Sequence, residues 1–140
     1  MNRLHRKRRI QSAPRRGAAV VEFALVSPLL IMLTLGMMEI GRVVMVKQLL
    51  INASREGARF AVLPGSTNAE VEAQVVEALQ PTISGATVSV DPPVIATAPA
   101  GTPITVAVTI PAANVSWIPH PLFTLNSDIH ASTTMRREGQ

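Results

Sequence analysis

The longest apolar run in the chain lies near its N-terminus and predicts a membrane-spanning helix. Residues 18–38 read AAVVEFALVSPLLIMLTLGMM, with Glu22 as the one charged side chain. In a helix this run rises about 30 Å, the thickness of the hydrocarbon core of a bilayer. A buried core helix is the alternative, but a chain of 140 residues has little else to cover it on all sides. We therefore expect a transmembrane helix at 18–38, with Pro28 tolerated inside it.

Helical spacing continues beyond this span. Apolar or small residues recur every three or four positions and form a seam on one helix face: Val43, Val46, Leu50, Ala53, Gly57 and Phe60. After Pro28 the next proline is Pro64, followed by Gly65, which is typical of a helix stop. One helix is thus expected from about Ala18 to about Leu63, with 39–63 as its extracytoplasmic continuation. The seam packs either on a partner helix or on the chain's own C-terminal part.

The remaining residues, 64–140, predict a small α+β domain, here called the head. Thr67 and Glu70 have the spacing of a capping box and open a second helix. Its expected apolar face consists of Val71, Val75, Val76 and Leu79. Alternation of apolar and polar residues then predicts strands at 86–90, 104–110 and 129–135. The expected fold is α+β: a long N-terminal membrane-spanning helix and a head with a second helix and a three- to four-stranded antiparallel sheet.

The charge distribution orients the span. Residues 1–17 contain seven basic residues and no acidic residue, whereas the rest of the chain is slightly acidic. A basic tail can bind nucleic acid, but next to an apolar span it is typical of a cytoplasmic flank. We expect residues 1–17 to be a cytoplasmic leader, the head to lie outside the membrane, and the chain to have no nucleic-acid partner.

The side chains give little support for catalysis. The chain has no cysteine, and its three histidines, at positions 5, 120 and 130, lack metal-ligand spacing. A catalytic triad of Ser116, His120 and Asp128 has little support, because no nucleophile motif surrounds the serine. We expect no enzyme activity, no metal site and no cofactor.

Glu22 is the unusual residue of the span. An unpaired carboxylate inside an apolar run is unfavourable in a membrane, although less so near the interface. Its side chain either extends to the headgroups, pairs with Arg15 or Arg16, or awaits a cation supplied by another chain. A free α-amine produced by proteolysis is such a cation.

The sequence around Glu22 resembles a known export signal. Residues 15–23 read RRGAAVVEF and precede the apolar run. This arrangement is similar to the class III signal peptide of type IV pilins and pseudopilins. In that family a prepilin peptidase cuts after the glycine and leaves glutamate as the fifth residue. The resemblance implies cleavage between Gly17 and Ala18, and a role in assembly for Glu22 and the neighbouring Phe23.

More of the chain resembles the TadE-like pseudopilins of the tight-adherence (Flp, type IVb) pilus system. The matching stretches are residues 15–42, NASREGARFAV at 52–62, ITVAVTIP at 104–111 and ASTTMRRE at 131–138. The second stretch contains the helix motif, which consists of Asn52, Arg55, Glu56, Gly57 and Arg59. Phe23 departs from the family, in which a tyrosine often follows the glutamate.

The resemblance implies a function in assembly. Such a protein is a minor pseudopilin with a pilin-like fold in the bacterial inner membrane, either incorporated in the pilus or retained at its base. The implied partners are a prepilin peptidase, other pilins and pseudopilins of the same system, the inner-membrane assembly platform and the lipid bilayer. The alternative is an unprocessed single-pass anchor whose extracytoplasmic module binds an envelope or secretion partner.

Overall fold

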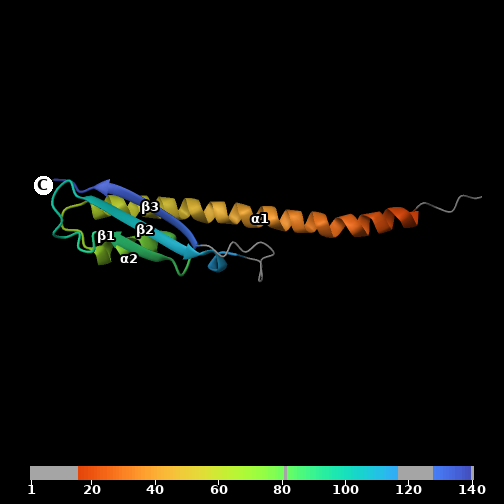
Figure 1. Ribbon diagram of the computed structural model, residues 1–140. Helices are drawn as coiled ribbons and strands as arrows, with labels where there is room; N and C mark the ends of the chain where they lie inside the picture. The colour runs from red at the N-terminus through yellow and green to blue at the C-terminus, as the bar shows by residue number, and fades with distance from the viewer. Residues whose placement is uncertain (1–15, 81, 117–127, 140) are drawn as a thin grey trace, which may run out of the picture. The chain divides into compact units, whose positions relative to one another are not determined.

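The computed structural model describes residues 16–80, 82–116 and 128–139 (Figure 1). Their elements are α1 (Arg16–Ala61), α2 (Asn68–Leu79), β1 (Thr87–Asp91), β2 (Pro103–Pro111), a short 3-10 helix η1 (Ala112–Asn114) and β3 (Asp128–Arg136). The chain divides into two compact units, an N-terminal unit at residues 1–35 and a C-terminal unit at residues 36–140. The expected α+β architecture, with one long N-terminal helix, a second helix and an antiparallel sheet, is confirmed.

In the N-terminal unit, α1 is apolar on every side. Residues 17–35 are exposed apart from the half-buried Ser27. Pro28 lies inside the helix without interrupting it. The helix tolerates this proline even though the residue has no N–H to donate to the preceding turn. Nothing else in this unit is available to cover the apolar side chains within the described range.

In the C-terminal unit, the same helix has one buried face. Val46, Leu50, Ala53 and Gly57 are buried, and Val43 and Phe60 at the two ends of the seam are half-buried. The seam therefore packs on the chain's own head, which is one of the two alternatives that its spacing allowed. The helix ends at Ala61, two residues before the expected Leu63.

Helix α2 begins as its sequence predicts. The Thr67 side chain accepts from the backbone N–H of Glu70, and the Glu70 carboxylate accepts from the backbone N–H of Thr67, so the capping box is confirmed. Val71, Val75 and Leu79 are buried. Val76 was expected on this face but is exposed, because it lies about 100° around the helix from Val75 and on the outer side.

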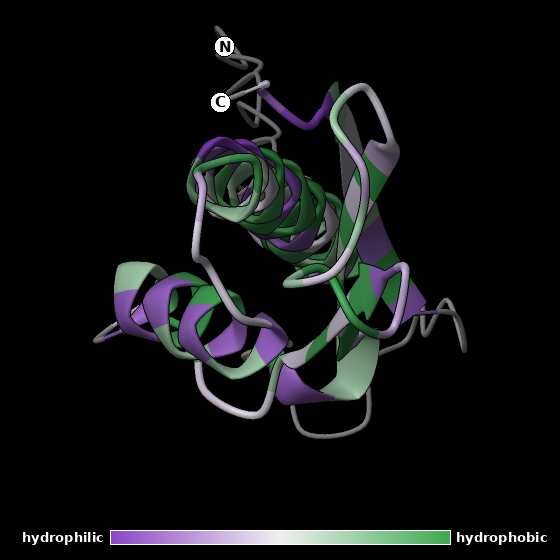
Figure 2. Ribbon diagram, turned by 90° about the vertical axis from the view of Figure 1, so that its left-hand side faces the viewer, coloured by the Kyte–Doolittle hydropathy of each residue, from purple (hydrophilic) through white to green (hydrophobic). Residues whose placement is uncertain are grey.

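The sheet has three antiparallel strands in the order β1-β2-β3. Each strand starts and ends within one residue of its expected bounds. Alternate β2 residues are buried, in the order Ile104, Val106, Val108 and Ile110. Figure 2 shows α1 and α2 beside each other against the sheet. The opposite face is polar and carries a hydrogen bond between the hydroxyls of Thr105 and Thr134, at 2.8 Å.

The loop between β1 and β2 is fixed by side chains from two distant elements. The Asn68 amide donates to the Pro92 carbonyl at 3.1 Å, and its oxygen accepts from the Ile95 N–H at 3.0 Å. Arg137, directly after β3, donates to the carbonyl of Ile95. Ile95 is fully buried as a result, so the loop closes one end of the core.

Candidate functional site

The predicted processing site lies in the first turn of α1. The helix begins at Arg16, so the bond between Gly17 and Ala18 joins two exposed helical residues. A Cβ built on Gly17 has no atom within 4 Å, so the described residues leave the surroundings open. The first N–H groups of a helix have no intrahelical acceptors, so this turn is the easiest part of α1 to unwind. Within the described residues, no other part of the chain covers the bond.

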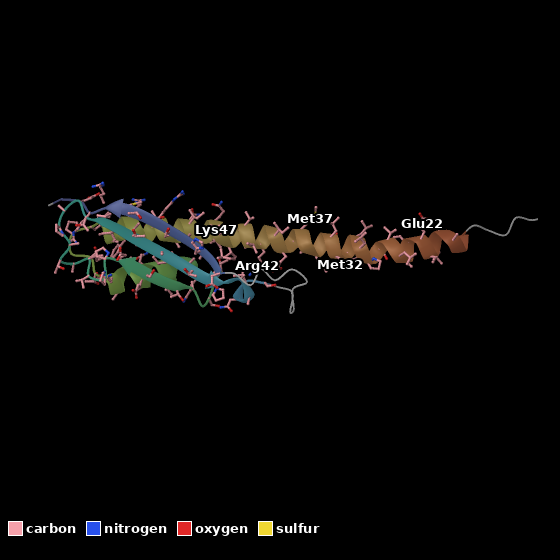
Figure 3. All side chains as sticks on the ribbon, in the orientation of Figure 1. Glu22, Met32, Met37, Arg42 and Lys47 are labelled. Carbon is pink, nitrogen blue, oxygen red and sulfur yellow. The ribbon has the colours of Figure 1, made fainter. Side chains whose placement is uncertain are left out.

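Glu22 lies one turn further along and is exposed (Figure 3). Its neighbours on the helix surface, three and four positions away, are Ala18, Ala19, Leu25 and Val26. All four are apolar, so α1 offers the carboxylate no polar neighbour at these positions. The side chains of Arg15 and Arg16 are outside the described residues, and their pairing with Glu22 stays a prediction.

Phe23 belongs to a continuous apolar surface on the first half of α1. Its side chain is 70% exposed, and Val20 and Val21 are exposed to a similar degree. In the described part of the chain, one helix is long and apolar enough to cross a membrane. Its most apolar 18-residue segment has a mean hydropathy of 2.2, and none of the residues in that segment is buried. This helix fits a membrane anchor.

The helix motif is divided between two faces of α1. Asn52, Arg55, Glu56 and Arg59 are exposed, whereas Gly57 is buried in the C-terminal unit. The structure thus separates the motif into a polar outer surface and a small-residue inner surface. Among the described residues, the four polar side chains therefore lie on the surface of the C-terminal unit.

Gly57 is a point of close approach between α1 and the head. A Cβ at this position would lie 2.3 Å from Cγ2 of Val75 in α2 and 3.2 Å from Cγ1 of Val106 in β2. Any side chain would force these valines to move, because Cβ atoms do not approach carbon this closely. The motif glycine therefore sets the spacing between α1, α2 and the sheet.

Three polar residues outside the motif also join α1 to the head. Ser54, next to the seam, has its hydroxyl 2.8 Å from that of Thr133 in β3. Arg42 donates through Nε to the Val115 carbonyl, and Lys47 donates to the His130 carbonyl (Figure 3 labels both cations). The sequence alone does not reveal these roles, because the partners of Arg42 and Lys47 are 73 and 83 positions away.

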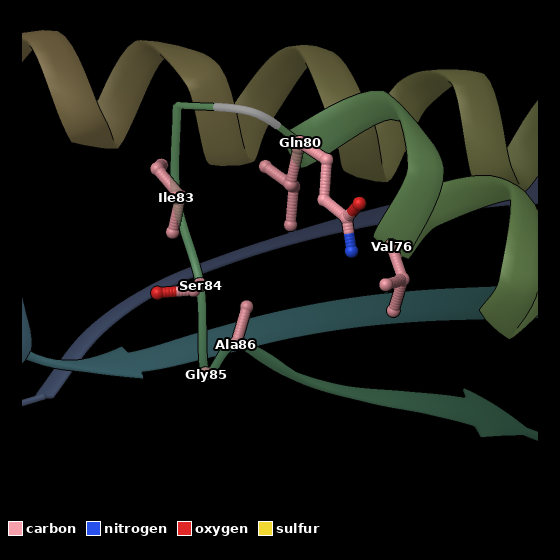
Figure 4. Close-up of a pocket in the computed structure, with 7 residues that line it drawn as sticks. Val76, Gln80, Ile83, Ser84, Gly85 and Ala86 are labelled. Atoms are coloured by element: carbon pink, nitrogen blue, oxygen red, sulfur yellow. The ribbon is translucent and has the colours of Figure 1, made fainter.

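The described residues contain no group of three or more metal-ligating side chains. His5 and His120 lie outside them, and His120 is the middle member of the candidate triad. A hollow of about 90 Å³ lies between the end of α2 and residues 83–86 (Figure 4). Drug-sized ligands occupy several times this volume. The hollow is therefore too small for a ligand of that size.

The comparisons with known proteins support the resemblance. Residues 17–59 match the model of the family described as TadE-like protein, which confirms the resemblance over α1. The match begins at the predicted processing glycine and ends at the last residue of the helix motif. No curated protein and no solved structure matches the chain. The family match is consistent with a protein of the Tad pilus system.

Proposed function

We propose that this chain is a minor pseudopilin of a Tad-type pilus, cut after Gly17 by a prepilin peptidase and acting in pilus assembly without enzyme activity of its own. One observation carries the proposal: Gly17, Ala18 and Glu22 are exposed on the first turns of a helix whose first half is otherwise mostly apolar, where the TadE-like match begins. Its partners are the peptidase, other pilins and pseudopilins, the assembly platform and the bilayer.

The position of Gly17 supports processing at the cytoplasmic face. Seven basic residues precede the bond and keep it out of the hydrocarbon, while the apolar run after it stays whole once the leader is removed. Glycine lacks a side chain, so the bond can enter a narrow active site. Unwinding one terminal turn of helix breaks few hydrogen bonds.

A substitution at Gly17 tests this step. We expect Gly17→Val to be inserted in the membrane but to keep its leader, because the new side chain blocks the active site. Ala19→Val is the matched control, since it adds similar bulk two residues beyond the bond, and it should be cut normally. Gel mobility of the membrane fraction, with and without the peptidase, measures the outcome. A Gly17→Val protein of mature size would contradict the proposed site.

Glu22 supplies the proposed register signal in assembly. After cleavage, Ala18 carries a free α-amine that is largely cationic at neutral pH. In an assembly, the amine of a neighbouring subunit can lie level with the Glu22 carboxylate. Burying this pair gains little net energy, but a misaligned neighbour leaves a charge unpaired, which costs about 3–5 kcal/mol. Glu22 thus selects one alignment and contributes little to folding.

The Glu22→Gln variant separates assembly from processing. It keeps the shape of the side chain and removes the charge, so insertion and cleavage should be normal while co-purification with partner pilins and pilus formation are lost. Glu39→Gln is the control, because Glu39 is an acid of the same helix outside the apolar run, and it should assemble. Normal pili from the Glu22→Gln strain would show that Glu22 only extends to the headgroups.

The proposed location is the bacterial inner membrane, with a single span and a cytoplasmic N-terminus. The basic residues at 1–17 favour this orientation. A reporter fused after Gln140 should be active only if it functions outside the membrane. Cytoplasmic activity of the reporter would contradict the orientation and, with it, the pilus function.

A further inference from the structure

We propose that the outer side of α1 between Ile40 and Met45 rests in the lipid headgroup layer, so that the membrane contact extends beyond the span onto the C-terminal unit. The proposal rests on the membrane anchoring proposed above and adds a surface and a boundary. Ile40, Val44 and Met45, here called the outer stripe, are 66%, 54% and 46% exposed.

The two cations in this part of α1 point to the side of the helix that faces the head. Glu39, Arg42 and Lys47 are half-buried. Arg42 and Lys47 donate to backbone carbonyls of the head, at Val115 and His130. Every exposed side chain from 40 to 46 is consequently apolar. A surface of this kind is unfavourable in water and favourable against lipid.

The exposed face changes character within one turn. After Met45, the next exposed residues of α1 are Gln48, Asn52 and Arg55, all of them polar. Met45, Gln48 and Asn52 lie close to one line along the helix, because successive residues are separated by three and four positions. A partner protein would be expected to cover part of both surfaces. A bilayer, in contrast, ends at one depth, which matches a boundary between Met45 and Gln48.

The length of the outer stripe also fits the headgroup layer. Residues 18–38 suffice to cross the hydrocarbon, and the rise from Ile40 to Met45 is about 8 Å. A bilayer has roughly 5–8 Å of polar interface on each side of its hydrocarbon core. The Val115 turn, held by Arg42, would then lie at the membrane surface. Apolar side chains with cations at their edge are typical of this layer.

Single-cysteine labelling tests the proposal, because the chain has no cysteine of its own. The full-length chain is labelled with an environment-sensitive fluorophore at Leu30, Met45 or Asn52 after substitution by cysteine. It is reconstituted in vesicles of phosphatidylethanolamine and phosphatidylglycerol. Quenching is measured with iodide in the water and with a lipid spin-labelled at its headgroup. If circular dichroism shows that the Met45→Cys variant has lost helix, Val44→Cys provides a second labelling position in the outer stripe.

We expect the label at Met45 to be quenched by the spin-labelled lipid several-fold more than the label at Asn52, and to be shielded from iodide. Equal quenching of the labels at Met45 and Asn52 by the spin-labelled lipid, with the label at Leu30 shielded from iodide, would overturn the outer-stripe proposal and leave the anchor intact. Iodide access to Leu30 would contradict the anchor and therefore both proposals. Shielding of Met45 that disappears at one chain per vesicle would show that a second copy, and not lipid, covers the stripe.

Discussion

Helix α1 has two parts that differ in where their apolar residues find partners. Residues 17–35 are exposed apart from the half-buried Ser27 and are mostly apolar around the helix, whereas residues 46–61 bury one face in the head and expose polar side chains on the other. The backbone is helical in both. A helix that is apolar all round needs an apolar surrounding, and one with an apolar stripe needs only a packing partner. Within the described residues, the chain supplies a packing partner for the second part and none for the first.

The comparison assigns separate tasks to the two parts. The second part stabilises the C-terminal unit through buried side chains such as Leu50 and through the close approach at Gly57. The first part contributes nothing to that core and keeps Glu22 on its surface. Substitutions in the first part should therefore affect membrane and assembly behaviour, and substitutions in the second should affect folding.

The largest expected effect comes from truncating the same residue type in each part. Leu50 is fully buried and Leu30 is 52% exposed. Leu50→Ala should lower the free energy of unfolding of the C-terminal unit by about 2 to 5 kcal/mol, because it leaves a cavity in the core. Leu30→Ala should leave that free energy unchanged. Denaturant unfolding in detergent, followed by circular dichroism, measures both, and similar losses would invalidate the division of α1.

The next largest effect is expected from two glycines of α1, whose substitution by alanine should change the free energy of unfolding in opposite directions. Gly57→Ala places a methyl group 2.3 Å from Cγ2 of Val75 and should destabilise the C-terminal unit by about 1–3 kcal/mol through overpacking. Gly41→Ala meets no atom within 4 Å and should stabilise the helix by about 0.5–1 kcal/mol, because alanine restricts the unfolded chain. The same unfolding experiment compares them. A stabilising Gly57→Ala would show that α1 packs less closely than described.

The smallest effect concerns the capping box of α2. Thr67→Ala removes the side-chain acceptor for the Glu70 N–H and should reduce the free energy of unfolding by about 1 kcal/mol. Thr97, an exposed residue in the loop between β1 and β2, is the control, and Thr97→Ala should change stability by less than about 0.5 kcal/mol. Equal effects of the two would mean that the box contributes nothing measurable.

Local pattern predicted most of the fold. The three strands lie within one residue of their expected bounds, because each alternates apolar and polar residues over its whole length. The capping box was predictable from two residues three positions apart. Val76 was assigned to the wrong face. It lies just beyond the edge of the apolar stripe of α2, and its hydropathy is the same as that of the buried Val75.

Contacts between distant residues were not predictable in the same way. The cations Arg42 and Lys47 look like ordinary solvated charges until the fold brings the Val115 and His130 carbonyls to them. Asn68 and Arg137 similarly fix Ile95 from far along the chain. The candidate processing residues rest on a motif and its context, and the structure adds their exposure and their place in the first turn of α1.

The N-terminus of the protein tests the central proposal most directly. Intact mass and N-terminal sequencing of the chain, extracted from membranes of cells with and without the peptidase, identify the first residue. We predict Ala18 when the peptidase is present and the full leader when it is absent. A chain that keeps residues 1–17 in both cells would contradict the pseudopilin function and favour an unprocessed membrane-anchored module.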